Sequence, residues 1–192
     1  GTELAATTKI WTQGDVQQTG NPLDLAINGE GFFIIRKPDN SIAFTRDGSF
    51  HIDRLGQIVN AQGYILEPGF VIPQDTVEVQ ISRDGYVEVL LDGETEPQSL
   101  GQIELARFIN PAGLRAVGDN LYVETPASGR VFFETPGQNN TGEILQRYLE
   151  TSNVDIVEEM VNMITAQRAY ELNSKSVRTA DDILGVAVNL KR

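Results

Sequence analysis

The chain has 192 residues, of which 40% are hydrophobic, and it carries a formal net charge of −12 with no cysteine and one histidine. These values indicate a folded acidic protein and exclude disulfides, zinc–thiolate sites, iron–sulfur clusters and multi-histidine metal sites. The acidity argues against nucleic-acid binding, because phosphates would be repelled. No apolar run approaches the ~20 residues of a membrane helix, so we expect no membrane insertion.

Most of the chain is predicted to be β-structured. Residues 1–19 are polar and lack a regular period, so we expect an extended connecting segment there. From 20 to 142 short apolar runs alternate with turn-forming residues, which predicts a β-rich domain or domains. Phe32 to Arg36 should pair with Ile42 to Arg46 as an antiparallel hairpin, and one further strand is predicted over 100–109.

The clearest hairpin joins residues 76–81 to residues 86–91. The Asp84-Gly85 pair between them favours a primed turn, whose twist matches that of the flanking strands. Alternation of apolar and polar residues predicts one buried and one exposed face. The apolar residues of the first strand are Val77, Val79 and Ile81.

The string Arg-Asp-Gly occurs twice with an aromatic residue close behind it, at 46–50 and at 83–86. Two copies are too few for a repeat architecture. We therefore interpret both copies as the same hairpin chemistry, with Asp-Gly in a tight turn.

The character of the sequence changes after a short connector at 143–152. Residues 153–192 predict one long helix, because Gly185 is the only glycine and no proline occurs between 154 and 190. Ser152 and Asp155 have the spacing of a capping box. The helix would be ~50 Å long, which is too long for a simple cap on a β domain.

The apolar side chains of this helix do not stay on one side. In its first half they lie opposite Asp155, Glu158 and Glu159, whereas in its second half charged residues occupy roughly that apolar side. Either the helix bends or breaks near Asn173-Ser174, or successive stretches face different neighbours in an assembly. The residues predicted to form the assembly interface are Val154, Val157, Met160, Val161, Met163, Ile164, Tyr170, Val177, Ile183, Leu184 and Val188.

Catalytic chemistry finds little support in the sequence. His51 lies in a predicted strand with no evident triad partner, so we expect it to be a surface residue. Carboxylates are plentiful enough for an acidic pair of the glycosidase type, but none has a distinguishing setting. The acidic stretch 92–96 lacks the ligand spacing of an EF-hand loop. We therefore identify no catalytic, cofactor-binding or metal-binding residue, and we expect neither a cofactor nor an enzyme.

Several stretches together resemble the bacterial flagellar rod and hook proteins, most of all the members that build the distal rod. The resemblance covers about 14–70 and 100–192. It is most specific in the C-terminal part, where Leu149-Glu150-Thr151-Ser152-Asn153-Val154-Asp155 precedes Gln167-Arg168-Ala169-Tyr170-Glu171. Earlier matching stretches are 19–33, 44–50 and 56–64.

The resemblance implies a structural subunit that assembles axially into the hollow, torque-transmitting rod of the flagellar basal body, which crosses the periplasm. Residues 149–192 would be the terminal helix, which in this family pairs with an N-terminal helix that is missing here, and residues 20–142 would form the outer wall. Implied partners are identical subunits, adjacent rod and hook proteins, and the surrounding ring proteins. Export would use the flagellar type III apparatus, and a cysteine-free chain suits export in an unfolded state.

Two other classes of protein remain open on the sequence alone. One is a secreted carbohydrate-active or adhesin-like β protein with a helical anchor, and the other is a tube subunit of a phage or secretion system. Two carboxylates facing each other across a cleft would favour the enzyme. An exposed apolar helix face would favour an axial polymer.

Overall fold

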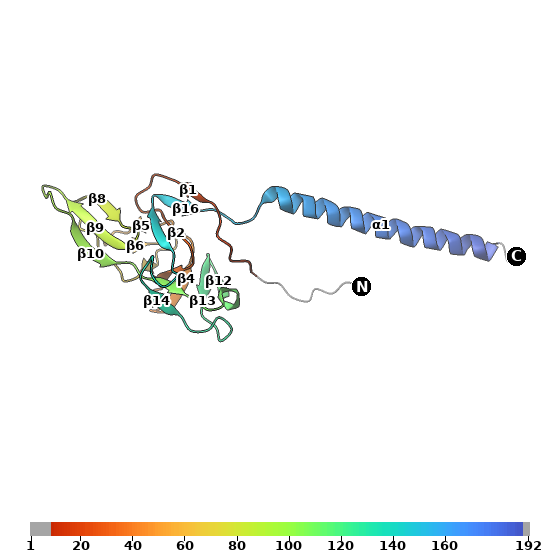
Figure 1. Cartoon of the computed structure of the whole chain (residues 1–192), viewed down its shortest axis with the longest axis horizontal. Coiled ribbons are helices and arrows are strands. Elements are labelled where there is room, and N and C mark those ends of the chain that lie inside the picture. The colour runs from red at the N-terminus through yellow and green to blue at the C-terminus, as the bar shows by residue number, and fades with distance from the viewer. Residues whose placement is uncertain (1–8, 190–192) are drawn as a thin grey trace. The chain divides into compact units, whose positions relative to one another are not determined.

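The computed structural model describes residues 9–189, apart from the side chains of residues 181, 182 and 184–189. The chain divides into a β unit that ends at Ser152 and a helical unit that begins at Asn153. Figure 1 shows the strands gathered in the first unit and one long helix in the second. The predicted fold class, mainly β followed by a long C-terminal helix, is confirmed.

The described part of the β unit contains short strands and one turn of 3-10 helix at Pro111–Gly113. Most connections between these strands are tight turns, as the turn-forming residues in the sequence predict. The strands are β1 Val16–Gln18, β2 Leu25–Asn28, β3 Phe32–Arg36, β4 Ile42–Thr45, β5 His51–Ile52, β6 Ile58–Val59, β7 Ile65–Leu66, β8 Thr76–Ile81, β9 Tyr86–Leu91, β10 Gln98–Gln102, β11 Leu105–Arg107, β12 Arg115–Gly118, β13 Leu121–Val123, β14 Phe132–Glu134, β15 Glu143–Gln146 and β16 Tyr148–Glu150.

The largest sheet is organised around β3. Along one edge β3 pairs antiparallel with β4, in a register that sets Phe33 opposite Thr45, so the predicted hairpin is confirmed. Along the other edge it pairs with β11 near its start and with β7 near its end. The sheet continues through β13 and β12 beyond β4, through β6 and β5 beyond β7, and through β14 beyond β11.

Alternate residues of β3 enter two separate hydrophobic cores. Phe33 and Ile35 belong to the larger cluster, whereas Phe32 and Ile34 belong to the smaller one. A strand covered on both faces explains the continuous apolar run in the sequence. The smaller core also receives Trp11, whose ring meets that of Phe32 edge to face at 5.0 Å between centroids. The segment before β1 is thereby attached to the β unit.

The β8–β9 hairpin is confirmed, but two details of its prediction are wrong. Val77 is 67% exposed because a bulge interrupts the register between Thr76 and Glu78, while Val79 and Ile81 are buried as expected. The turn is not of the primed type I′, which requires positive φ at both central residues. Among the turn residues only Gly85 has a positive φ, of 85°, so a left-handed glycine closes the turn.

The single strand predicted over 100–109 is also wrong. The chain forms β10 and β11 instead, and the two belong to different sheets. Between them Ile103 is fully buried, and its amide donates a hydrogen bond to the carbonyl of Gly85 at 2.8 Å. The apolar run continues across this step because Ile103 fills the core while the chain crosses from one sheet to the other.

The two Arg-Asp-Gly strings differ physically, so their interpretation as one hairpin chemistry is wrong. Only the second is a hairpin turn. In the first, Gly48 lies against the backbone of Leu25, and a Cβ atom there would fall 1.6 Å from the Leu25 carbonyl oxygen. The close approach permits the hydrogen bond from the Leu25 amide to the Gly48 carbonyl, at 3.0 Å. Glycine is required at 48 by space rather than by its φ.

Replacing Gly48 with alanine should therefore strongly destabilise the β unit. We expect Gly48→Ala to lower the free energy of unfolding by about 3 kcal/mol or more, because backbone must move to admit the methyl group. Urea unfolding followed by the fluorescence of Trp11, the only tryptophan, would measure the change.

Gly93→Ala is the matched control. Gly93 has a left-handed φ of 84° but no atom within 4 Å of an added Cβ, so only about 1–2 kcal/mol of backbone strain is expected there. Equal losses in the two variants would contradict a packing role for Gly48.

Candidate assembly surface on the C-terminal helix

Helix α1 spans Ile156–Asn189 and begins at a side-chain cap. One carboxylate oxygen of Asp155 accepts hydrogen bonds from the amides of Val157, at 2.8 Å, and Glu158, at 3.3 Å. A carboxylate there also interacts favourably with the positive end of the helix dipole. The prediction that Ser152 is the cap is wrong, because helical backbone starts three residues later than the capping-box spacing implies.

The helix continues through Asn173 and Ser174, so the alternative in which it breaks there is wrong. Its change of apolar side consequently occurs along one continuous helix (Figure 1). In the part of the chain that the structure describes, no helix is both long enough and apolar enough to cross a membrane.

The predicted interface residues are exposed wherever their side chains are described. Their exposed fractions range from 47% for Ile164 to 77% for Tyr170. Ile156 and Leu172, which the sequence prediction omitted, are similarly exposed, and their apolar character alone could have identified them. The side chains of Leu184 and Val188 lie outside the described residues. The exposed members of the predicted set are Val154, Val157, Met160, Val161, Met163, Ile164, Tyr170, Val177 and Ile183.

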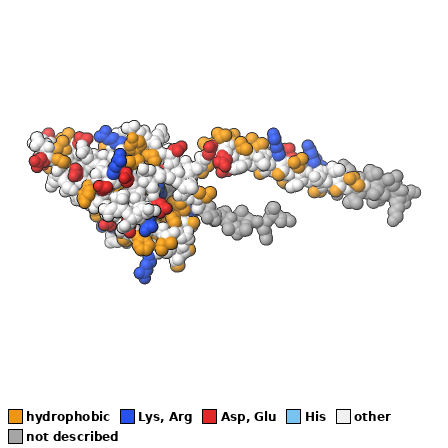
Figure 2. All heavy atoms as spheres, in the orientation of Figure 1, with side chains coloured by type: hydrophobic (Ala, Val, Ile, Leu, Met, Phe, Trp, Pro, Cys, Tyr) orange, Lys and Arg blue, Asp and Glu red, His pale blue; other side chains and the backbone are white. Residues whose placement is uncertain are grey.

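The apolar side chains form two patches on opposite sides of the helix. At ~100° per residue, the first patch is centred about half a turn away from the second. In Figure 2 one side of the helix is hydrophobic in its first turns and carries Lys and Arg farther along. The first patch consists of Ile156, Val157, Met160, Val161, Met163 and Ile164, and the second of Ala169, Val177, Ala180 and Ile183.

Charge changes sides together with the apolar residues. In the first half the acidic residues Asp155, Glu158 and Glu159 lie opposite the first patch, and in the second half Arg168, Lys175 and Arg178 lie opposite the second patch. All six residues are exposed. Every ion pair among the described residues lies within the β unit. The helix charges therefore have no ion-pair partner within the described chain.

The chain leaves the β unit through a two-stranded ribbon of β1 and β16. Val16 pairs with Glu150 in this ribbon, and the amide of Thr151 donates to the carbonyl of Asp15 at 2.8 Å. The ribbon holds the last residues before the helical unit. Its attachment to the β unit depends on one arginine.

Arg46 is the centre of this attachment. Its Nη2 lies 2.6 Å from Oε2 of Glu150, and its Nη1 donates to the carbonyls of Gly29, at 2.7 Å, and Gly31, at 2.9 Å. The other carboxylate oxygen of Glu150 accepts the amide of Gly14 at 2.9 Å. Both side chains are largely buried, with 19% and 12% exposed. A single ion pair thus joins β16, the end of β4, the β2–β3 turn and the segment before β1.

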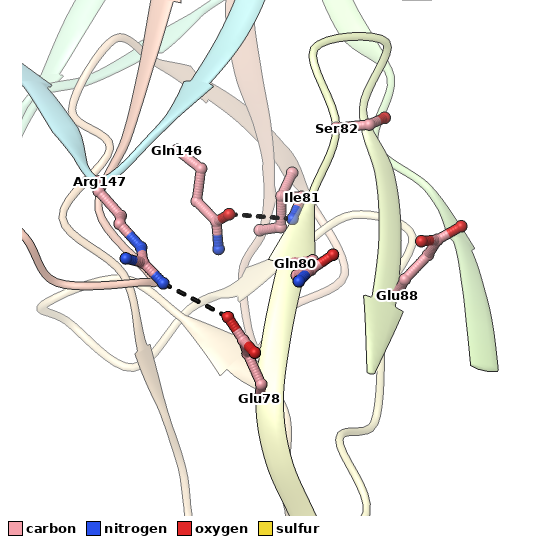
Figure 3. Close-up of a pocket in the computed structure, with 7 residues that line it drawn as sticks. All are labelled: Glu78, Gln80, Ile81, Ser82, Glu88, Gln146 and Arg147. Carbon is pink, nitrogen blue, oxygen red and sulfur yellow. Dashed lines mark hydrogen bonds and ion pairs between the residues drawn. The ribbon is translucent and has the colours of Figure 1, made fainter. Parts of the chain in front are cut away.

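A shallow polar pocket lies where β8 meets β15 and β16 (Figure 3). The Gln146 side chain points at the free edge of β8, where it accepts from the amide of Ile81 and donates to the carbonyl of Val79. Glu78 points toward Arg147, 3.5 Å away. These side chains connect the hairpin to the body of the β unit.

Other chemistry considered from the sequence has a simple location. His51 lies in β5 and is exposed, as predicted. Within the described residues, no group of three or more His, Cys, Asp or Glu side chains could hold a metal ion. The acidic stretch 92–96 begins in a turn, in which the amide of Glu94 donates to the carbonyl of Leu91.

Comparison with known proteins gives the class to which this architecture belongs. Residues 26–89 match the family model of the flagellar hook protein FlgE/F/G D1 domain, and residues 145–190 match that of the flagellar basal body rod FlgEFG protein C-terminal region. The first match covers β-unit strands, and the second covers β16 and the helix.

Individual relatives narrow the class. The flagellar basal-body rod protein FlgG of Borreliella burgdorferi is 50% identical over the whole chain and 73% of its own length. FlgG of Buchnera aphidicola subsp. Schizaphis graminum is 50% identical over 96% of the chain and 71% of its own length. The flagellar hook protein FlgE of Salmonella typhimurium is 46% identical over 62% of the chain and 29% of its own length. The chain therefore belongs to the flagellar rod and hook proteins, and among them to the FlgG basal-body rod proteins.

Removing the Arg46 side chain should loosen the ribbon. We expect Arg46→Ala to lower the free energy of unfolding by about 3 kcal/mol, because it leaves the Glu150 carboxylate and several carbonyls without a partner. Hydrogen exchange of the β1 and β16 amides should accelerate more than that of the β3 amides.

The control is Arg83→Ala, which removes an exposed ion pair with Glu143 at 3.6 Å. We expect a loss of at most about 1 kcal/mol there. Equal effects of the two substitutions, or unchanged exchange at β1 and β16, would contradict the role assigned to Arg46.

Proposed function

We propose that the protein is a structural subunit of the distal flagellar rod, which polymerises axially with identical copies into a hollow shaft that transmits torque. The observation that carries this proposal is the single helix with two exposed apolar patches on opposite sides. A soluble protein seldom leaves such patches uncovered. Two patches facing different ways suit contact with more than one neighbour, as an open polymer requires.

The division of labour within the subunit follows from this proposal. Residues 153–192 contribute the helix that packs in the inner tube, and residues 20–142 form the outer wall. The segments 1–19 and 143–152 connect the two. This division is supported by the β1–β16 ribbon, which joins the entering and leaving segments and is held by the Arg46–Glu150 ion pair.

Partners are proposed on the same basis. Identical subunits cover the helix patches, adjacent rod and hook proteins continue the shaft at its ends, and the ring proteins of the basal body surround the outer wall. The proposal assigns no catalytic role to the chain. Its support is the family membership together with the structural use of the pocket residues, such as the Glu78–Arg147 ion pair.

Placing a charge in the first apolar patch should block assembly. Burying a Val side chain contributes about 1.5–3 kcal/mol, and a buried unpaired carboxylate would cost more than that. We therefore expect Val161→Asp to abolish swimming and to leave no complete rod in isolated basal bodies. Because Val161 is 55% exposed, the β unit should still fold, as Trp11 fluorescence would verify.

Asn162→Asp is the matched control, since it adds the same charge one residue away on the acidic side of the helix. We expect this variant to swim. Normal motility of the Val161→Asp strain would overturn the assembly role of the helix.

A further inference from the structure

The reversal of apolar and charged sides along α1 points to the arrangement of neighbouring copies. We propose that the first half of the helix in one copy packs against the second half of the helix in a parallel neighbour, shifted by half a helix length. This inference rests on the proposed function and names the partner of each helix half. The occupant of each apolar patch is thus a second copy of this chain.

Two sides of the helix need to be distinguished. Side one presents Val157, Val161 and their apolar neighbours in the first half, and Arg168, Lys175 and Arg178 in the second half. Side two presents Asp155, Glu158 and Glu159 in the first half, and Val177, Ala180 and Ile183 in the second half. Glu171 is the one acidic residue on the basic part of side one.

Parallel copies in register would be poorly matched. When side one of one copy faces side two of the next, the apolar first half meets carboxylates, and the basic second half meets apolar side chains. Charges would lose water without gaining a partner, which is costly. A fully overlapping antiparallel pair has the same fault, because it sets the apolar half of side one against its basic half.

A shift of half the helix removes both conflicts. The helix has 34 residues, so half of it corresponds to about 25 Å. The first apolar patch of one copy then meets the second apolar patch of its neighbour. The basic half of side one extends beyond that neighbour and meets the acidic half of a further copy, one helix length along.

This pattern of contacts propagates without closing. Each copy uses side one to touch two others and side two to touch two more, so the contact is heterologous and generates an open array. Charge complementarity also selects the direction, because only parallel neighbours satisfy the apolar and the ionic match together. The alternation of sides in the helix sequence is thereby explained as a stagger between subunits.

Engineered cysteines test the stagger directly, because the chain has no cysteine. We expect the double variant Glu158→Cys with Lys175→Cys, assembled into rods by the complete protein in cells, to form disulfide-linked ladders under mild oxidation. Residues 158 and 175 are 17 positions apart on one helix, so they cannot be joined within one copy. Neither single variant should form ladders.

A second cysteine pair reports the competing arrangement. Met160→Cys with Asn162→Cys places thiols at one level on opposite sides of the helix, and it should form ladders only if copies pack in register. Rods that contain this ladder and lack the 158–175 ladder would overturn the stagger but not the proposed function. Dimers from Val157→Cys alone would indicate antiparallel pairing of first halves and would also overturn it.

Charge exchange provides an independent readout. Glu158→Lys with Glu159→Lys, or Lys175→Glu with Arg178→Glu, should each reduce the number of rods by about tenfold, because like charges would then meet. Combining all four substitutions should restore rod formation. Failure of the combination to restore it, while the Val161→Asp variant still loses its rods, would overturn the stagger and leave the proposed function standing.

Discussion

The apolar surface that α1 exposes is the constraint on which the rest of this structure depends. Val157, Met160 and Ile164 stand in water on a continuous helix, and residues of the same kind stand on its opposite side farther along. Burial of such side chains is worth about 1.5–3 kcal/mol each, so the helix gains most of its stabilisation from neighbours. A subunit of this kind completes its own packing only when it assembles, which is the property that a polymer needs.

The β unit has the opposite character. Its sheet places β3 between two cores, and its strands already cover one another. Mechanical continuity with the helix is provided by the β1–β16 ribbon, which Arg46 holds through Glu150 and the carbonyls of Gly29 and Gly31. A largely buried bidentate ion pair resists distortion better than an exposed one. Load applied to the helical unit would therefore reach the body of the β unit through this junction.

Much of this architecture could be predicted from residue patterns, and the failures have identifiable causes. The β8–β9 hairpin and the helix were found because their periods of two and 3.6 residues are local properties. The strand predicted over 100–109 failed because one apolar run served two sheets. The cap at Ser152 failed because a spacing rule fits more than one position, and backbone geometry selected Asp155. The importance of Arg46 gave no local signal, since its partner Glu150 lies 104 residues away.

The sequence by itself determined the class of fold, the extent of the helix, and the exchange of apolar and charged residues between its sides. Family motifs in its C-terminal part further indicated a rod subunit, a class that the relatives confirm. The tertiary structure decided which residues hold the β unit to its ribbon, why Gly48 must be glycine, and that the helix continues through Asn173 and Ser174. These features depend on contacts between residues distant in the chain, or on a choice between local alternatives of similar energy. Periodicity encodes neither.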